Sequence, residues 1–163
     1  DDKVIAINSF SKSWLMTGWR MGWMVHPEGL SGTVAKLIQI STSGVPQFIQ
    51  RAGIAALEGG DEVIEGLRTR CLVGRDIVFD RLDKWPRVRA TRPNGAFYAF
   101  FAVDRMSDSV PFCKELIDRC NVGLAPGSAF GPSGEGYLRL CYASTPEKLH
   151  QAMDALEMVI GGS

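Results

Sequence analysis

SFSKSWLMTGWRMG, residues 9–22, sets one lysine and one arginine among hydroxyls, small residues and large apolar side chains. Taken alone, Lys12 would be explained as a solvated loop residue and Arg20 as half of an ion pair. The spacing of the whole stretch favours another explanation. A lysine in an apolar pocket loses its proton more readily, because burial disfavours the charged form. We therefore expect Lys12 to be buried and to act as a neutral nucleophile.

The residues around Lys12 suit one particular aldehyde. A lysine amine forms a Schiff base with a carbonyl, and pyridoxal phosphate carries an aldehyde together with a phosphate. Arg20 is a suitable phosphate ligand, since guanidinium binds phosphate oxygens in a fork. Ser9 and Ser11 add short hydroxyl donors close to Lys12 in the sequence. Together these residues indicate a pyridoxal phosphate site.

Two strands are expected to frame this stretch. Residues 4–8 are apolar almost throughout and predict a short buried strand, whose outgoing loop carries Ser9 and Lys12. Open α/β sheets bind ligands at such strand ends. A second strand is predicted over residues 19–25, where Gly22 leaves room for a ligand beside Arg20.

The rest of the chain alternates helices and strands. Expected helices cover residues 30–41, 46–57, 61–84 and 110–120, and a last one is capped by Ser144 or Thr145. Expected strands cover residues 96–103, 122–125 and 137–142. A helix over residues 61–84 would span ~36 Å, long enough to run from one domain into the next.

Arg139 is a charged residue at the centre of the expected strand 137–142. Alternation places Leu138, Leu140 and Tyr142 on one face and Arg139 on the other. An internal ion pair or a gatekeeper on an edge strand would each explain such an arginine.

Composition excludes several classes of function. The 163 residues hold 18 Lys plus Arg and 18 Asp plus Glu, so we expect neither nucleic acid nor a membrane as a partner. The four cysteines form no Cys-x-x-Cys pair, and His26 and His150 complete no zinc spacing. We expect no metal site, and buried reduced thiols in a cytoplasmic protein.

The stretch around Lys12 resembles the lysine-attachment motif of class I and II aminotransferases, of the aspartate aminotransferase fold type. The match comprises Phe10-Ser11-Lys12, Leu15-Met16 and Gly18-Trp19-Arg20-Met21-Gly22. Residues 136–143, GYLRLCYA, are similar to the segment in which this family carries its substrate-binding arginine. Residues 93–98 and 125–131 match the family more loosely, and we expect no catalytic role for them.

The resemblance implies a role for each candidate residue. Lys12 would be the Schiff-base lysine, Ser9 and Arg20 would contact the cofactor phosphate, and Arg139 would bind the α-carboxylate of the substrate. The implied reaction is transamination between an amino acid and a 2-oxo acid. Lys12 would act as the base at Cα, and the intact enzyme would be a homodimer.

The resemblance also implies a fold, of class α/β to α+β. Residues 1–60 would end the large cofactor-binding domain, residues 61–85 would form a connecting helix, and residues 86–163 would form the small C-terminal domain. The acid that pairs with the pyridine nitrogen lies upstream in the family. We therefore expect a C-terminal fragment that binds the cofactor weakly and is inactive by itself.

Two other functions fit the same residues. Some transcription regulators carry an aminotransferase-like domain that senses a ligand and keeps the lysine. A lyase or synthase of the same fold would keep the cofactor and change the reaction.

Overall fold

The computed structural model describes residues 3–162 and divides into two compact units, Asp1–Leu67 and Arg68–Ser163. In chain order the elements are β1 (Ala6–Ser9), α1 (Phe10–Ser13), η1 (Thr17–Trp19), β2 (Gly22–Val25), η2 (Glu28–Leu30), α2 (Ser31–Thr42), α3 (Gln47–Gly59), α4 (Asp61–Leu82), β3 (Val88–Ala90), β4 (Tyr98–Val103), α5 (Ser109–Cys120), β5 (Ala125–Pro126), η3 (Gly127–Phe130), η4 (Pro132–Gly134), β6 (Tyr137–Cys141), α6 (Pro146–Leu156) and the π-helical turn η5 (Glu157–Gly161). The boundary between the units lies within α4.

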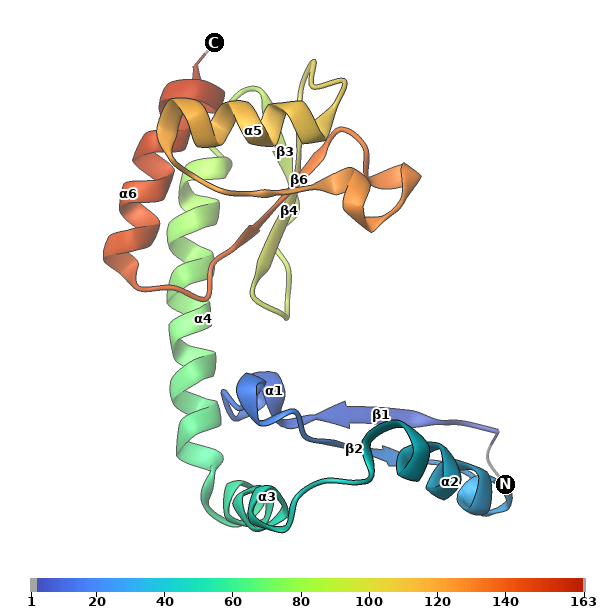
Figure 1. The fold of residues 1–163 in the computed structure, drawn as a ribbon. Helices are drawn as coiled ribbons and strands as arrows, with labels where there is room; N and C mark the ends of the chain where they lie inside the picture. Colours follow the sequence, from blue (N-terminus) through green and yellow to red (C-terminus); the bar gives the residue numbers. More distant parts are fainter. Residues whose placement is uncertain (1–2, 163) are drawn as a thin grey trace. The chain divides into compact units, whose positions relative to one another are not determined.

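In the first unit β1 and β2 form an antiparallel pair (Figure 1). In its register Ser9 lies opposite Gly22. Both strands are shorter than expected, because residues 4 and 5 precede β1 and Trp19 belongs to η1. Every residue of β1 is exposed, so the prediction of a buried strand is wrong. Burial of an apolar strand requires other elements over its faces, and within the described residues β1 remains exposed along its whole length.

A small core joins residues 10–21 to α3. Phe10, Met16 and Met21 are buried, and Ile49, Ala52 and Ala56 of α3 pack against them. Two glycines allow residues 10–21 to approach the helix α3 and the residue that follows it. A Cβ at Gly53 would lie 2.6 Å from Met21 Cε, and one at Gly60 would lie 2.6 Å from the Trp14 ring. The segment that carries Lys12 is therefore held by packing on its apolar side.

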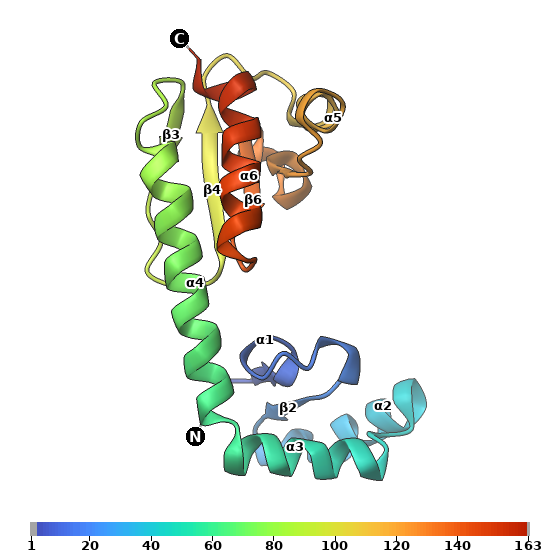
Figure 2. The same cartoon turned by 90° about the vertical axis from the view of Figure 1, so that its left-hand side faces the viewer.

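The second unit is an antiparallel sheet in the order β3-β4-β6-β5, covered on one face by helices. Figure 2 shows α4 and α6 side by side over this sheet. Alternation along β6 sends Leu138 and Leu140 into the core. The buried core consists of Val78, Phe79, Leu82, Trp85, Ala99, Phe101, Val103, Cys113, Leu116, Leu138, Leu140, Tyr142, Leu149, Met153, Leu156 and Ile160.

The mixed α and β composition is confirmed, and so are the expected helices to within a few residues. Thr145 caps α6, since its hydroxyl accepts a hydrogen bond from the Lys148 N–H. The sequence pattern does not predict strand β3. This strand is three residues long and pairs only with β4, so its sequence carries little periodicity.

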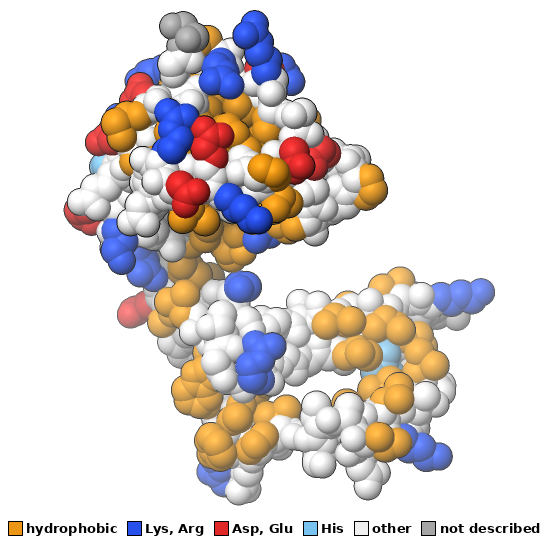
Figure 3. Space-filling model, turned by 45° about the horizontal axis from the view of Figure 1, so that its top comes forward, with side chains coloured by type: hydrophobic (Ala, Val, Ile, Leu, Met, Phe, Trp, Pro, Cys, Tyr) orange, Lys and Arg blue, Asp and Glu red, His pale blue; other side chains and the backbone are white. Residues whose placement is uncertain are grey.

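Side chains at the surface correct the expectation that the thiols are buried. All four cysteines are free, but only Cys113 is buried, and Cys141 is exposed. Hydrophobic side chains also reach the surface of both units (Figure 3), and in the first unit they include Ile7 and Ile40. None of the helices in residues 3–162 is long and apolar enough to cross a membrane.

Candidate functional site

Ser9 sits where β1 passes into α1. Its backbone is extended, with φ −144° and ψ 142°, and its Oγ accepts a hydrogen bond of 3.0 Å from the Ser11 N–H. This is an N-cap, which satisfies one of the free backbone donors at the start of a helix. The Ser9 hydroxyl keeps its own proton to donate elsewhere.

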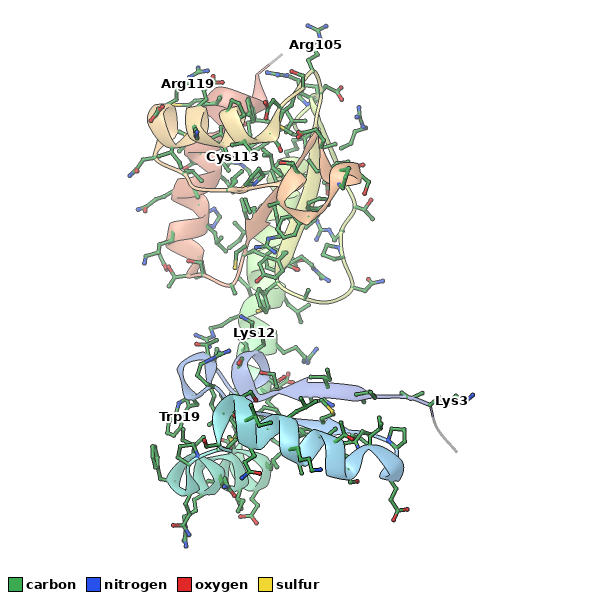
Figure 4. The ribbon with its side chains drawn as sticks, turned by 45° about the vertical axis from the view of Figure 1, so that its right-hand side comes forward. Lys3, Lys12, Trp19, Arg105, Cys113 and Arg119 are labelled. Carbon is green, nitrogen blue, oxygen red and sulfur yellow. The ribbon has the colours of Figure 1, made fainter. Side chains whose placement is uncertain are left out.

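Lys12 lies in the single turn of α1 and is exposed, so the expectation that it is buried is wrong (Figure 4). The helix itself explains the difference. Phe10 takes the inward position and is 5 % exposed. A residue two positions later points to the opposite side of a helix. The aromatic packing of Phe10 thus holds the backbone beneath Lys12, while the Lys12 side chain lies on the exposed side of the turn.

Arg20 adopts the left-handed conformation at the end of η1, with φ 51° and ψ 45°. Its Nη1 donates a hydrogen bond of 2.7 Å to the Thr17 carbonyl oxygen, which folds the side chain back over its own turn. The Phe10 N–H donates to the Met21 carbonyl oxygen at 3.2 Å, and this bond joins the Arg20 turn to the start of α1. The structure therefore brings the backbones of Ser9, Lys12 and Arg20 into one connected turn region.

The donor set of this region suits a phosphorylated aldehyde. It combines the amine of an exposed lysine residue, the hydroxyls of Ser9 and Ser11, and a guanidinium with most of its N–H groups left over from one internal hydrogen bond. Gly22 has a different role from the one expected. A Cβ there would collide with the Asn8 carbonyl oxygen, so the glycine makes room for the neighbouring strand rather than for a ligand.

Arg139 belongs to the second unit and points away from its core, as alternation predicts. Its guanidinium carbon lies 4.3 Å from the ring centroids of both Tyr98 and Phe130. Within residues 3–162 no carboxylate forms an ion pair with it. Strand β6 lies between β4 and β5 and is not an edge strand. Both structural explanations for this arginine, the internal ion pair and the edge gatekeeper, are therefore wrong.

The aromatic neighbours of Arg139 are not evident from the sequence, where core packing is the default for Phe130. The register of the β4–β6 pair shows which aromatic side chains share a face with Arg139. Phe100 lies directly opposite Arg139 across the β4–β6 pair, so Tyr98 and Phe100 share its face. In the part of the chain that the structure describes, no group of three or more acidic, histidine or cysteine side chains could hold a metal ion.

The chain is similar to known proteins both as a family and as individual relatives. The family model described as aminotransferase class I and II matches residues 1–156. An aspartate aminotransferase of Pyrococcus horikoshii is 37% identical over 164 residues, which cover 99% of this chain and 42% of that protein. An aromatic-amino-acid aminotransferase of Thermococcus litoralis is 36% identical over 162 residues, 98% of this chain and 41% of that protein.

Solved structures agree with the sequence relatives. A crystal structure of an aromatic aminotransferase from Pyrococcus horikoshii matches with a TM-score of 0.89 at 34% identity, covering 95% of this chain and 42% of that one. An aspartate aminotransferase from Thermotoga maritima matches with a TM-score of 0.86 at 36% identity, covering 99% and 41%. The chain thus spans about two fifths of the length of the relatives it matches.

Proposed function

Because the chain belongs to the class I and II aminotransferase family, we propose that the protein moves an amino group between an amino acid and a 2-oxo acid with pyridoxal phosphate. Its relatives include enzymes named for aspartate and for aromatic amino acids. The part common to these substrates is the α-amino acid, with its amine, its Cα–H bond and its carboxylate. We propose that the protein recognises this shared part of its substrates.

Four residues of the first unit would hold the cofactor. Lys12 would bond to the aldehyde, and Ser9, Ser11 and Arg20 would donate hydrogen bonds to the phosphate. When bound, pyridoxal phosphate supplies an aldehyde for the amine and a ring that accepts electrons from the substrate Cα.

Residues of the chain would then carry out proton transfer at Cα and hold the α-carboxylate of the substrate. Once the substrate amine has displaced it from the aldehyde carbon, the Lys12 amine would take the proton from the substrate Cα and hold it for return to that former aldehyde carbon. Arg139 binds the α-carboxylate in a bidentate pair, which fixes the direction of the Cα–H bond.

The observation that carries the proposal is the unpaired guanidinium of Arg139. A half-buried cation is stabilised by a partner, and residues 3–162 supply no carboxylate to it. A carboxylate from a substrate would complete the pair.

The same proposal extends to the domains, the assembly and the location. We assign residues 1–60 to the end of the large domain, residues 61–85 to the connecting helix and residues 86–163 to the small domain. The protein would work as a homodimer in the cytoplasm. The exposed apolar side chains of the first unit, such as Ile7 and Ile40, support an interface there. Light scattering of the full-length protein should give twice the mass of one chain.

The substitution Lys12→Ala tests the role of the lysine. In the full-length protein we expect transamination of aspartate, phenylalanine or alanine with 2-oxoglutarate to fall by about 10²–10⁴-fold. After borohydride reduction, mass spectrometry should find the cofactor on the Lys12 peptide of the unmodified protein and on no peptide of the variant.

Lys36→Ala is the matched control, because Lys36 is another exposed lysine of the same unit. It should keep both the activity and the attached cofactor. A Lys12→Ala protein that still carries the cofactor covalently would contradict the assignment.

A further inference from the structure

The Arg139 guanidinium is held between two aromatic rings from different parts of the second unit. Tyr98 belongs to β4 and Phe130 to η3, and each ring centroid lies 4.3 Å from the guanidinium carbon. Attraction between a cation and an aromatic face uses none of the N–H groups of arginine. An ion pair with a carboxylate would occupy them. The rings therefore hold the cation and leave its donors available to a ligand.

A row of aromatic side chains supports this arrangement from one side. The Tyr137 ring is stacked on Phe100 at 4.9 Å with an interplanar angle of 5°. Phe100 meets Phe130 edge to face at 6.0 Å and 88°. Such contacts restrict the rings beyond what burial alone achieves. Phe130 is 49% exposed, so its position depends on this contact and on the course of its loop.

The loop that carries Phe130 is fixed at its base by hydrogen bonds. The Ser109 hydroxyl, fully buried, lies 2.9 Å from the Ser128 hydroxyl, and the Ser109 N–H donates to Glu135 Oε1 at 2.7 Å. The Gly136 N–H donates to the same oxygen at 3.0 Å, and these bonds hold the pKa of the Glu135 carboxyl below its usual value.

Two glycines close the same loop by backbone contact. A Cβ on Gly127 would collide with the Gly134 carbonyl oxygen, and one on Gly134 would collide with that of Gly127. Only residues without a side chain allow this approach. The loop is therefore built to a fixed course, and Phe130 is presented from it.

We propose that Tyr98 and Phe130 are positioning residues that hold the Arg139 guanidinium ready for the substrate carboxylate. This inference rests on the proposed function. It adds that the two rings contribute to the affinity of the protein for its substrate. An arginine side chain has several rotatable bonds, and ordering them on binding weakens affinity. The two rings restrict that freedom before the substrate arrives. Removing a ring should therefore weaken substrate binding more than it slows the chemical step.

Substitution of each ring in the full-length protein tests the proposal. With the best amino donor among aspartate, phenylalanine and alanine, we expect Tyr98→Leu and Phe130→Leu each to raise KM by about tenfold, as loss of a partly desolvated cation–π contact implies. We expect kcat to stay within about twofold, which would indicate loss of binding alone. Tyr98→Phe and Phe130→Tyr should restore KM, because each keeps an aromatic face.

Tyr137→Leu is the matched control on the same sheet. The Tyr137 ring stacks on Phe100 and has no contact of this kind with Arg139. Its loss removes support from Phe130 only indirectly, through Phe100, so KM should rise by less than about twofold, well below the rise in Phe130→Leu. Because Phe130 is half exposed, Phe130→Leu leaves the core intact, and a thermal melt of every variant checks this.

A double-mutant cycle separates this inference from the function on which it rests. In an Arg139→Ala background, Phe130→Leu should change KM no further, because the ring acts through the arginine. An unchanged KM in Arg139→Ala would contradict the proposed role of Arg139 itself. A raised KM in Arg139→Ala, with both leucine variants unaffected, would overturn only the positioning role. A Phe130→Leu effect that persists without Arg139 would overturn it as well.

Discussion

The two units differ sharply in how their apolar side chains are used. In the second unit sixteen buried side chains from helices, strands and the turns between them form one core, whereas the core of the first unit has three. The first unit is not poorer in apolar residues. Many of them are exposed, however, and among these Ile7 is 74% exposed and Ile40 is 84% exposed. An apolar pattern thus predicts that a segment becomes a strand or helix. It predicts burial only where other elements exist to cover the segment.

The same difference separates the two candidate cations. Arg139 is held in a sheet with a packed face below it and aromatic rings around it. Lys12 lies in a helix of one turn, which is anchored by Phe10 and is open on its other side. The carboxylate-binding candidate is therefore preorganised within its unit, whereas the lysine lies on a short turn beside a much smaller core.

The largest expected effect comes from truncating one apolar side chain in each unit. Phe101 is fully buried, so Phe101→Ala should lower the free energy of unfolding of the second unit by about 3–5 kcal/mol. Measured on the 163-residue chain as a monomer, Ile7→Ala in the exposed strand β1 should change stability by less than about 0.5 kcal/mol. Hydrogen exchange, read separately for β4 and β1, measures both. A comparable loss in the two units would break the contrast.

A smaller effect is expected from two glycines of one helix. A Cβ at Gly74 would collide with the Tyr142 carbonyl oxygen, whereas a Cβ at Gly66 meets nothing within 4 Å. Gly74→Ala should therefore destabilise the second unit by about 1–3 kcal/mol, since α4 must move away from the sheet. Gly66→Ala should stabilise the helix by about 0.5–1 kcal/mol. Urea denaturation of the two variants gives the sign of each change, and equal signs would refute the packing argument.

The smallest effect concerns alkaline pH and is confined to the second unit. Burial raises the pKa of the Cys113 thiol above its ordinary value of 9.0 and that of the Tyr142 hydroxyl above 10.0. The first unit, residues 1–67, contains neither cysteine nor tyrosine.

A raised pKa means that the folded state keeps its proton to a higher pH than the unfolded state does. The contribution to stability is complete below pH ~9 and is lost as the pH rises through the folded pKa values. Urea denaturation between pH 7 and 10 should show this fall in the free energy of unfolding, and Cys113→Ala should reduce it. An identical pH profile in the variant would show that Cys113 contributes nothing.

Local patterns predicted much of this molecule. Alternation placed Leu138 and Leu140 on one face and Arg139 on the other, and the structure buries the leucine face. The sequence marks Ser144 or Thr145 as the cap of the last helix, and the structure shows that it is Thr145. These features depend on neighbours in sequence. The exposure of Lys12 and the contact between Phe130 and Arg139 do not. They depend on which elements cover a segment and on the register of strands about 40 residues apart, such as Phe100 opposite Arg139.

The contact between Gly127 and Gly134 bears on how this protein could be redesigned. Because backbone meets backbone at that point, the course of the loop does not depend on the ring at its tip. The side chain at position 130 can therefore be varied without changing the course of the loop backbone. A library varied at position 130 alone would sample new surroundings for the cation while the scaffold stays the same. Variation at Gly127 or Gly134 would mostly yield chains in which the loop backbone no longer takes this course.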